Sequence, residues 1–239
     1  MRGSVVRIFI SSLFFLLLSS QSIASQLEPF KATYTARYNG ISVTATRELT
    51  GQEGNWRLDF KTSALFASIK EYSRFTNQDG SITPYHYEYR RKGLGRDRGT
   101  VLSFEPDKNM VLNVSNPERD MENVSPNILD KLSYQMQLAL DVAAGKENLQ
   151  YEVADGKKIR KYTFAQEGTE VVKTPMGKIE AIKVRRVRDA DSERETTVWI
   201  APQWNYALVK LVQLEENGKK YQITLKNLSI NGKTVGAGQ

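Results

Sequence analysis

The segment Lys31-Ala-Thr-Tyr-Thr-Ala-Arg-Tyr-Asn-Gly40 indicates the fold more directly than any other stretch of this chain. Its small and aromatic residues alternate with polar ones, which is the period of a β-strand with one buried face. The Asn-Gly dipeptide at its end supplies two residues that readily adopt positive φ, as a tight hairpin turn requires. The segment therefore predicts a strand that turns directly into an antiparallel partner.

Three further dipeptides of the same kind, Asp79-Gly80, Asp155-Gly156 and Asn217-Gly218, also lie between alternating runs. Four such turns predict an antiparallel meander, and we expect about a dozen short strands. The other alternating runs are Trp56, Leu58 and Phe60; Tyr85, Tyr87 and Tyr89; Ala207, Val209 and Leu211; and Tyr221, Ile223 and Leu225.

One segment has a different period. Ser125-Pro126 is typical of a helix N-cap followed by proline at the first helical position, and the helix is predicted to run from Pro126 to Ala144, before Gly145. Because only one of its faces is apolar, we expect it to pack on the sheet, either plugging an open end of a barrel or covering one side. The apolar positions at helical spacing are Leu129, Leu132, Met136, Leu140 and Ala143.

These elements predict an all-β, mainly antiparallel fold with one amphipathic α-helix. A flat sheet of this size would expose long edges and could not cover its own apolar face. We therefore expect a curved sheet that closes into a barrel or near-barrel, lipocalin-like in outline.

The first 24 residues are typical of a cleavable signal peptide. Arg2 and Arg7 precede the apolar run Ile8–Leu18, and Ser22-Ile-Ala24 places small residues where signal peptidase cleaves. Residues 25–239 then form a single domain. The chain contains no cysteine, which argues against a lipid-modified anchor and fits a Gram-negative periplasm better than an animal secretory route.

The residues that carry most enzyme and metal chemistry are scarce. His86 is the only histidine, which excludes multi-histidine metal sites, and the absence of cysteine excludes cofactors held by thiolates. We therefore expect neither a metal nor a cofactor. The carboxylates Asp59, Glu71 and Glu88 could form a glycosidase-like pair, although outward residues facing Arg or Lys across the sheet explain them as well. We predict no catalytic residues and a protein that is not an enzyme.

A tyrosine stripe and a basic run adjoin each other between residues 85 and 98. Tyr85, Tyr87 and Tyr89 are predicted to share a face that is either core or the lining of a cavity. The run from Arg90 to Arg98 is either a solvated loop or a rim that contacts anions, which in the periplasm would be lipid or lipopolysaccharide headgroups rather than nucleic acid. The predicted ligand-binding residues are Tyr34, Trp56, Phe60, Tyr85, Tyr87, Tyr89, Arg91, Lys92 and Arg96.

Three stretches resemble a family of exported proteins, domain of unknown function 3108. They are Asn127-Ile-Leu-Asp-Lys-Leu-Ser133, Thr174-Pro-Met-Gly-Lys-Ile-Glu-Ala-Ile-Lys-Val184 and Thr197-Val-Trp-Ile-Ala-Pro202, the last followed by a strand from Tyr206. The resemblance implies an envelope protein with a barrel-like β fold. It implies no catalytic residues, because the family has none agreed.

Three hypotheses follow for the function. The first is a periplasmic carrier that holds an apolar or amphiphilic envelope component, such as a lipid, in an aromatic interior with a basic rim. The second is an interaction protein of envelope assembly or polymer export, with a solid barrel and an envelope protein as partner. The third is a carboxylate-based glycan hydrolase. None of the three makes the chain an integral membrane protein, because no segment after the signal peptide is apolar enough.

Overall fold

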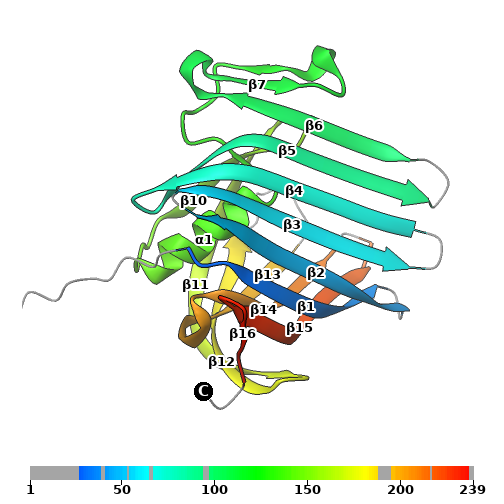
Figure 1. The fold of residues 1–239 in the computed structure, drawn as a ribbon, viewed down its shortest axis with the longest axis vertical. Coiled ribbons are helices and arrows are strands. Elements are labelled where there is room, and N and C mark those ends of the chain that lie inside the picture. Colours follow the sequence, from blue (N-terminus) through cyan, green and yellow to red (C-terminus); the bar gives the residue numbers. More distant parts are fainter. Residues whose placement is uncertain are drawn as a thin grey trace, which may run out of the picture.

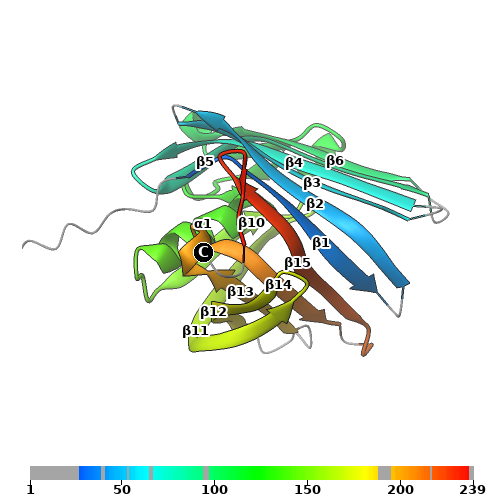
Figure 2. The ribbon, with the colours of Figure 1, turned by 60° about the horizontal axis from the view of Figure 1, so that its bottom comes forward.

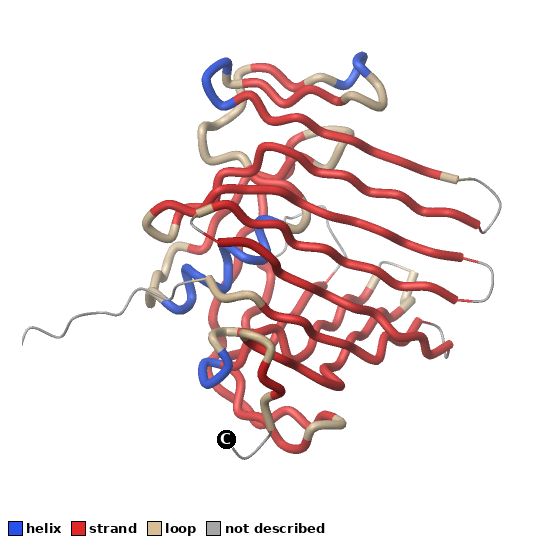
Figure 3. Tube along the Cα trace, in the orientation of Figure 1, coloured by secondary structure: helices blue, strands red, loops and turns tan. Residues whose placement is uncertain are grey.

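The computed structural model describes residues 27–38, 41–52, 54–64, 67–93, 97–187, 195–215 and 217–236. The expected signal peptide, residues 1–24, lies outside them. Strands predominate, with one α-helix and three short 3-10 turns (Figures 1 and 3). The elements up to residue 122 are β1 (Phe30–Tyr38), β2 (Ile41–Gln52), β3 (Asn55–Ala64), β4 (Ala67–Gln78), β5 (Ser81–Gly93), β6 (Arg98–Glu105), β7 (Met110–Asn113) and β8 (Met121–Glu122). The remaining elements are β9 (Leu129–Asp130), α1 (Ser133–Ala143), β10 (Leu149–Ala154), β11 (Ile159–Thr174), β12 (Gly177–Val187), β13 (Glu195–Ala201), β14 (Ala207–Leu214), β15 (Lys220–Ile230) and β16 (Lys233–Thr234).

All sixteen strands belong to one sheet, in the order β8-β7-β6-β5-β4-β3-β2-β1-β15-β14-β13-β12-β11-β10-β9, with β16 paired to β15. The antiparallel meander is confirmed, although the strands are more numerous than expected, and within the described residues only β9 with β10 is a parallel pair. The strand order ends in β8 and β9, which have two residues each, so the sheet exposes very short edges.

The sheet curls until its two halves face each other across α1 (Figure 2). Side chains bridge the halves: the Asn113 amide donates to the Gly156 carbonyl at 2.8 Å, and the Ser73 hydroxyl donates to the Asp130 carboxylate at 2.6 Å. The predicted near-barrel is therefore confirmed, with closure by side chains rather than by a continuous ladder.

The predicted turns place the strands as expected. Asp79 and Gly80 both adopt positive φ, at 50° and 79°, and join β4 to β5. Asp155-Gly156 and Asn217-Gly218 each lie between strands that pair antiparallel. Asn39-Gly40 lies outside the described residues, and the strands on either side of it, β1 and β2, pair antiparallel.

The helix begins later than the sequence predicts. Residues 125–128 form a turn closed by the Ile128 amide on the Ser125 carbonyl, and β9 then pairs with β10 before α1 starts at Ser133. The buried Asp130 carboxylate accepts the amides of Leu132 and Ser133 at 2.8 and 2.9 Å, so the first helical turn is satisfied from β9 and not from Ser125. The expected docking is correct, since the predicted apolar positions from Leu129 to Leu140 are buried.

The core consists of two clusters of buried side chains. The larger surrounds α1, between the two halves of the sheet, and the smaller joins β1 and β15 to β13 and the tip of the β11–β12 hairpin. No helix among the described residues is long and apolar enough to cross a membrane.

Candidate functional site

The candidate site lies on the inner face of the sheet, defined as the face of β1–β6 that α1 contacts. The register of the strands places Arg47, Phe60, Glu71 and Tyr89 directly opposite one another on β2, β3, β4 and β5. Neighbouring positions in such a row have Cβ atoms about 5 Å apart. A basic, an aromatic, an acidic and a phenolic side chain therefore share one band of the inner face, which we call the middle row.

Burial differs on the two sides of this row. On the side of α1, the helix end, the inward positions Leu49, Leu58, Ser73 and Tyr87 are at most 1% exposed. On the other side, the open end, the inward positions Val43, Thr62, Ile69 and Arg91 are only half-buried, although Ala45, directly opposite Thr62, is fully buried in the smaller core cluster. Further along that side Ile41 is 63% and Tyr221 39% exposed. The helix therefore seals one end of the inner face and leaves apolar side chains accessible at the other.

Arg47 is the most unusual residue of the middle row. Its side chain is only 5% exposed, and its Nε has no hydrogen-bond partner. Its guanidinium acts on the Tyr34 hydroxyl, whose pKa is raised by burial and lowered in part by this cation. Arg47 takes part in none of the ion pairs between described residues. A buried cation without a carboxylate is costly, and such a group calls for an explanation.

The surroundings of Arg47 are mostly apolar, apart from Gln135 and the hydroxyl groups of neighbouring tyrosines such as Tyr34. It borders a cavity of about 40 Å³ beneath α1, in which Tyr134 contributes its ring from the helix. Burial raises the pKa of Tyr134, whose ring lies against Tyr162 and Phe164 at centroid distances of 5.2 and 6.2 Å. The other lining residues are Gln135, Leu138, Ala139, Phe164, Val198, Ile200, Tyr206, Leu208 and Leu211.

The remaining charges of this region are partly paired. Glu71 accepts the Tyr87 hydroxyl, and the Lys131 ammonium lies 4.0 Å from Glu71 and 4.9 Å from the centre of the Tyr89 ring. Burial and the adjacent Glu71 raise the pKa of Tyr87 well above its ordinary value, so Tyr87 stays protonated and donates. Glu71 is thereby committed to Tyr87 and Lys131, and Arg47 remains the cation of the middle row that has no such partner.

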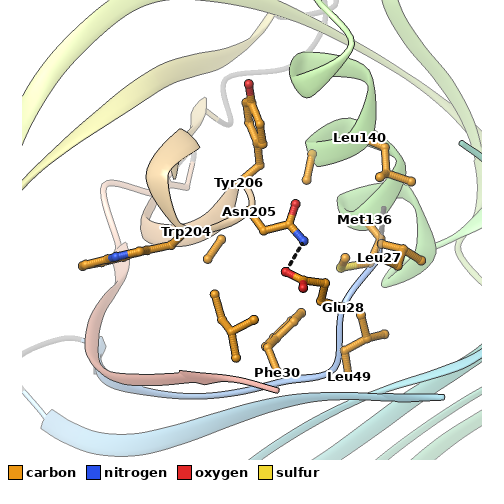
Figure 4. Close-up of a pocket in the computed structure, with 12 residues that line it drawn as sticks. Leu27, Glu28, Phe30, Leu49, Met136, Leu140, Trp204, Asn205 and Tyr206 are labelled. Atoms are coloured by element: carbon orange, nitrogen blue, oxygen red, sulfur yellow. Dashed lines mark hydrogen bonds between the residues drawn. The ribbon is translucent and has the colours of Figure 1, made fainter. Parts of the chain in front are cut away.

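A second small cavity, of about 30 Å³, lies on the other side of Ala139 and Tyr206 (Figure 4). Leu27, Phe30, Leu49 and Met136 line it, and the Asn205 amide donates to Glu28 at 3.2 Å at its border. Each of these two cavities has room for only about one or two water molecules, so neither could take an acyl chain.

A larger polar cavity, of about 320 Å³, lies where α1 meets the β4–β5 turn and β10. Its buried carboxylate, Asp141, accepts the Gln137 amide and the Tyr151 hydroxyl, both at 2.9 Å, and pairs with Lys146 at 2.7 Å. Gln137 in turn bonds the backbone of Gly80 and Ile82. These groups fasten the helix to the sheet, and all of them are already engaged.

The nine predicted ligand-binding residues are only partly brought together. Phe60, Tyr89 and Arg91 lie on the inner face at or beyond the middle row, and Tyr34 lies beside Arg47, with its hydroxyl donating to the Leu208 carbonyl at 3.0 Å. Trp56 and Tyr87 belong to the buried core at the helix end. Arg96 lies outside the described residues.

Tyr85 and Lys92 do not lie on the inner face. The β4–β5 register shifts between Arg74 and Phe75, so Tyr85 is bulged out of the ladder and its side chain is 41% exposed. The predicted common face of Tyr85 with Tyr87 and Tyr89 is therefore wrong. Lys92 alternates with Arg91 and is exposed on the outer face.

Arg47 is not among the residues predicted for the site, although the sequence contains a signal for it. Arg47 occupies the apolar phase of its strand, in step with Val43, Ala45 and Leu49, where a charged residue is unexpected. Glu71 breaks the pattern of β4 in the same way, two positions from Ser73 and four from Phe75. Charged residues at the buried positions of a strand were therefore the sequence signal that could have predicted the middle row.

The carboxylates considered for hydrolysis do not converge. Asp59 and Glu88 lie on the outer face, where each pairs with an arginine of its own strand, Arg57 and Arg90. Glu71 lies on the inner face, so the expectation that it faces outward is wrong. Within the described residues no group of three or more histidine, aspartate or glutamate side chains is arranged to hold a metal ion.

The comparisons with known proteins address the family and the fold. The family model described as protein of unknown function, DUF3108, matches residues 33–226. No curated protein matches the chain.

Among solved structures, a β-barrel-like protein of domain of unknown function DUF1849 from Brucella abortus superposes with a TM-score of 0.59 at 12% identity, covering 86% of this chain and 98% of its own. This likeness supports the barrel-like fold. A predicted lipoprotein from Parabacteroides distasonis has a TM-score of 0.37 at 11% identity, covering 85% of this chain and 96% of its own. A DUF1329 family protein from Desulfovibrio piger has a TM-score of 0.27 at 12% identity, with 88% of each chain covered.

Proposed function

The chain belongs to the DUF3108 family of proteins of unknown function, and we propose that it is a non-enzymatic periplasmic carrier that binds an anionic amphiphile of the cell envelope on its inner face. The observation that carries this proposal is Arg47, a buried guanidinium with an unpartnered Nε and mostly apolar surroundings. A carboxylate or phosphate headgroup would supply the missing acceptor through charge-assisted hydrogen bonds.

The open end supplies a place for the apolar chain of the ligand. Val43, Ile69 and Ile223 lie there in the inward phase of their strands and stay half-buried because α1 does not reach them. Exposed apolar surface of this kind marks binding sites in soluble proteins. A chain lying along these residues from Arg47 outward would bury them and leave the core at the helix end undisturbed.

Basic side chains beyond the middle row favour an anion over a neutral ligand. Arg91 is the next inward residue of β5 after Tyr89, toward the open end, and Arg98 on β6 is directly opposite Arg91. Arg186 stacks on the Tyr162 ring at 3.9 Å, on the facing half of the sheet. The inner face therefore presents a positive potential in the direction from which a ligand would enter.

A fluorescent fatty-acid probe, displaced by hexadecanoate or by neutral hexadecanol, tests this proposal. Arg47→Met should weaken hexadecanoate binding by roughly 10- to 100-fold, because hydrogen bonds to a charged group contribute about this much to affinity. The affinity for hexadecanol should be unchanged. Arg74→Met, which removes an exposed arginine from the outer face, is the matched control and should bind as the wild type does. A wild type that takes up no probe would overturn the carrier function.

The small apolar cavities at the helix end favour a second candidate, an interaction protein of envelope assembly with a solid barrel. Two of the cavities beside α1 have only about 30 and 40 Å³, too little for an acyl chain, and the third, of about 320 Å³, is lined by polar groups that are already engaged. The same experiment separates the candidates, because a solid barrel takes up neither hexadecanoate nor hexadecanol.

A further inference from the structure

The outer face of β3–β5 is strongly basic. At the described outward positions of these strands six cationic side chains stand against two carboxylates, Asp59 and Glu88. Figures 1 and 2 show this face on the side of the sheet away from α1, with no other described element over it. The six cations, which we call the basic outer face, are Arg57, Lys61, Lys70, Arg74, Arg90 and Lys92.

The register of the strands concentrates three of these charges in one row. Lys61 is directly opposite Lys70, and Lys70 is directly opposite Arg90. Like charges in directly opposed positions destabilise a sheet. Lys70, at the centre, forms no ion pair or side-chain hydrogen bond with the described residues, whereas Lys61 and Arg90 reach carboxylates on their own strands. Lys70 therefore gains no ion pair from the fold, and its position between two opposed cations calls for an explanation outside the fold.

The chemistry of the face favours lipid headgroups over a protein. Protein interfaces have an apolar or aromatic centre, enriched in tyrosine and tryptophan. The aromatic side chains on the described part of this face are Tyr72 and His86, which stack on each other, with Arg57 lying 3.8 Å above the Tyr72 ring, and Tyr85 at the bulge. A broad surface with cations and almost no free apolar area matches a layer of anionic headgroups, which needs charge alone.

We propose that the basic outer face docks the protein on a membrane surface rich in anionic phospholipid. The face lies on the opposite side of the sheet from Arg47, so docking leaves the inner face free. The proposal goes beyond cargo binding, because it requires no ligand on the inner face.

Co-sedimentation with vesicles tests it. The wild type should bind vesicles of equal phosphatidylglycerol and phosphatidylcholine, and not vesicles of phosphatidylcholine alone. The triple variant Lys61→Ser, Lys70→Ser, Arg90→Ser should bind the anionic vesicles on the order of 100-fold more weakly at low salt, since each cation near such a surface contributes about a factor of five. Raising the salt should weaken wild-type binding, because exposed charges are screened over ~8 Å at physiological ionic strength.

Two controls make each outcome decisive. The variant Lys173→Ser, Lys178→Ser, Lys226→Ser removes three exposed lysines from the other half of the sheet and should bind as the wild type does. Arg47→Met should also keep vesicle binding, which separates this proposal from the carrier function.

Three results would overturn the docking proposal: equal loss in both triple variants, equal binding to neutral vesicles, or retention on poly-glutamate beads without binding to vesicles. The last would identify an acidic protein as the partner. Folding of the outer-face variant is checked by its denaturation midpoint, which should change little, because the substitutions remove opposed like charges together with the exposed ion pairs Lys61–Asp59 and Arg90–Glu88.

Discussion

The helix end and the open end of the inner face are built from the same strands and differ in what covers them. Leu58 on β3 is fully buried, whereas Thr62, four residues further along the same strand and on the same face, is half-buried. The alternation of the sequence is the same in both places, and the difference comes from α1, which packs over one end only. On β3 burial therefore follows the coverage by α1, whereas Ala45 on β2, directly opposite Thr62, is buried in the smaller core cluster that the strands form among themselves.

The two ends also differ in how their polar groups are satisfied. At the helix end, Asp130 accepts three hydrogen bonds, from the Ser73 hydroxyl and from two amides of the helix start. At the middle row, Arg47 keeps an unpartnered Nε. Asn77 Oδ1 and Trp204 Nε1, both toward the helix end, also lack partners, so the middle row differs in having a buried cation beside accessible apolar surface, which is typical of a binding site.

The largest expected effect is at the helix end. Leu132 is 3% exposed in the main core, so Leu132→Ala should lower the free energy of unfolding by ~2–5 kcal/mol. Chemical denaturation measures it. Ile41→Ala, at the open end and 63% exposed, should change it by less than about 0.5 kcal/mol. Equal losses for the two variants would remove the distinction between the ends.

The second prediction concerns pH and Asp130. Burial raises the pKa of this carboxyl from 3.8 to about 6, although hydrogen bonds from Ser73, Ser133 and Leu132 lower it in part. A raised folded pKa means that ionisation costs stability, so the cost is absent below pH ~4 and fully present above pH ~6. Asp130→Asn should raise the free energy of unfolding by roughly 2–3 kcal/mol at pH 7.5 and change it little at pH 4.

Denaturation midpoints measured from pH 4 to 7.5 check the Asp130 prediction, with the exposed Asp107→Asn as control. Parallel pH profiles for wild type and Asp130→Asn would show that another carboxylate governs this range.

The third prediction sets stability against function at the middle row. Replacing a buried cation that has no ion pair with an apolar side chain of similar length should raise the free energy of unfolding by about 1–2 kcal/mol. Arg47→Met should therefore unfold at higher denaturant concentration while it loses anionic-probe binding. A variant that loses both binding and stability would make Arg47 part of the structural core.

The smallest effect on stability is expected at Ile69, on the open end. Ile69→Trp should change the free energy of unfolding by less than about 0.5 kcal/mol, because the side chain is half-buried and not confined by α1. It should nevertheless reduce uptake of the fatty-acid probe by occupying the space of the chain, and Ile69→Val should not. Unchanged uptake in Ile69→Trp would move the ligand away from the open end.

Local patterns in the sequence predicted the strands and turns well. The alternation from Ala32 to Ala36 and the positive φ of Asp79-Gly80 depend only on neighbouring residues. The helix start could not be predicted, because it depends on the pairing of β9 with β10 and on the contact of Asp130 with Ser73, 57 residues away. The bulge at Tyr85 depends equally on a partner strand.

The candidate site was only partly predictable for the same reason. The common face of Phe60 and Tyr89 follows from alternation alone, whereas Arg91, expected on a loop, lies on β5. Arg47 becomes notable only once its surroundings are known to lack a carboxylate. The assignment of Lys92 to the ligand site ignored the alternation that separates it from Arg91.

The pairing of β1 with β15 joins residues at opposite ends of the chain, such as Phe30 with Ile230. The ribosome must therefore synthesise almost the whole protein before this seam can form, and sheets dominated by such distant pairings fold in milliseconds to seconds rather than microseconds. The topology that holds the folded barrel together therefore also delays its completion until the chain is almost fully synthesised.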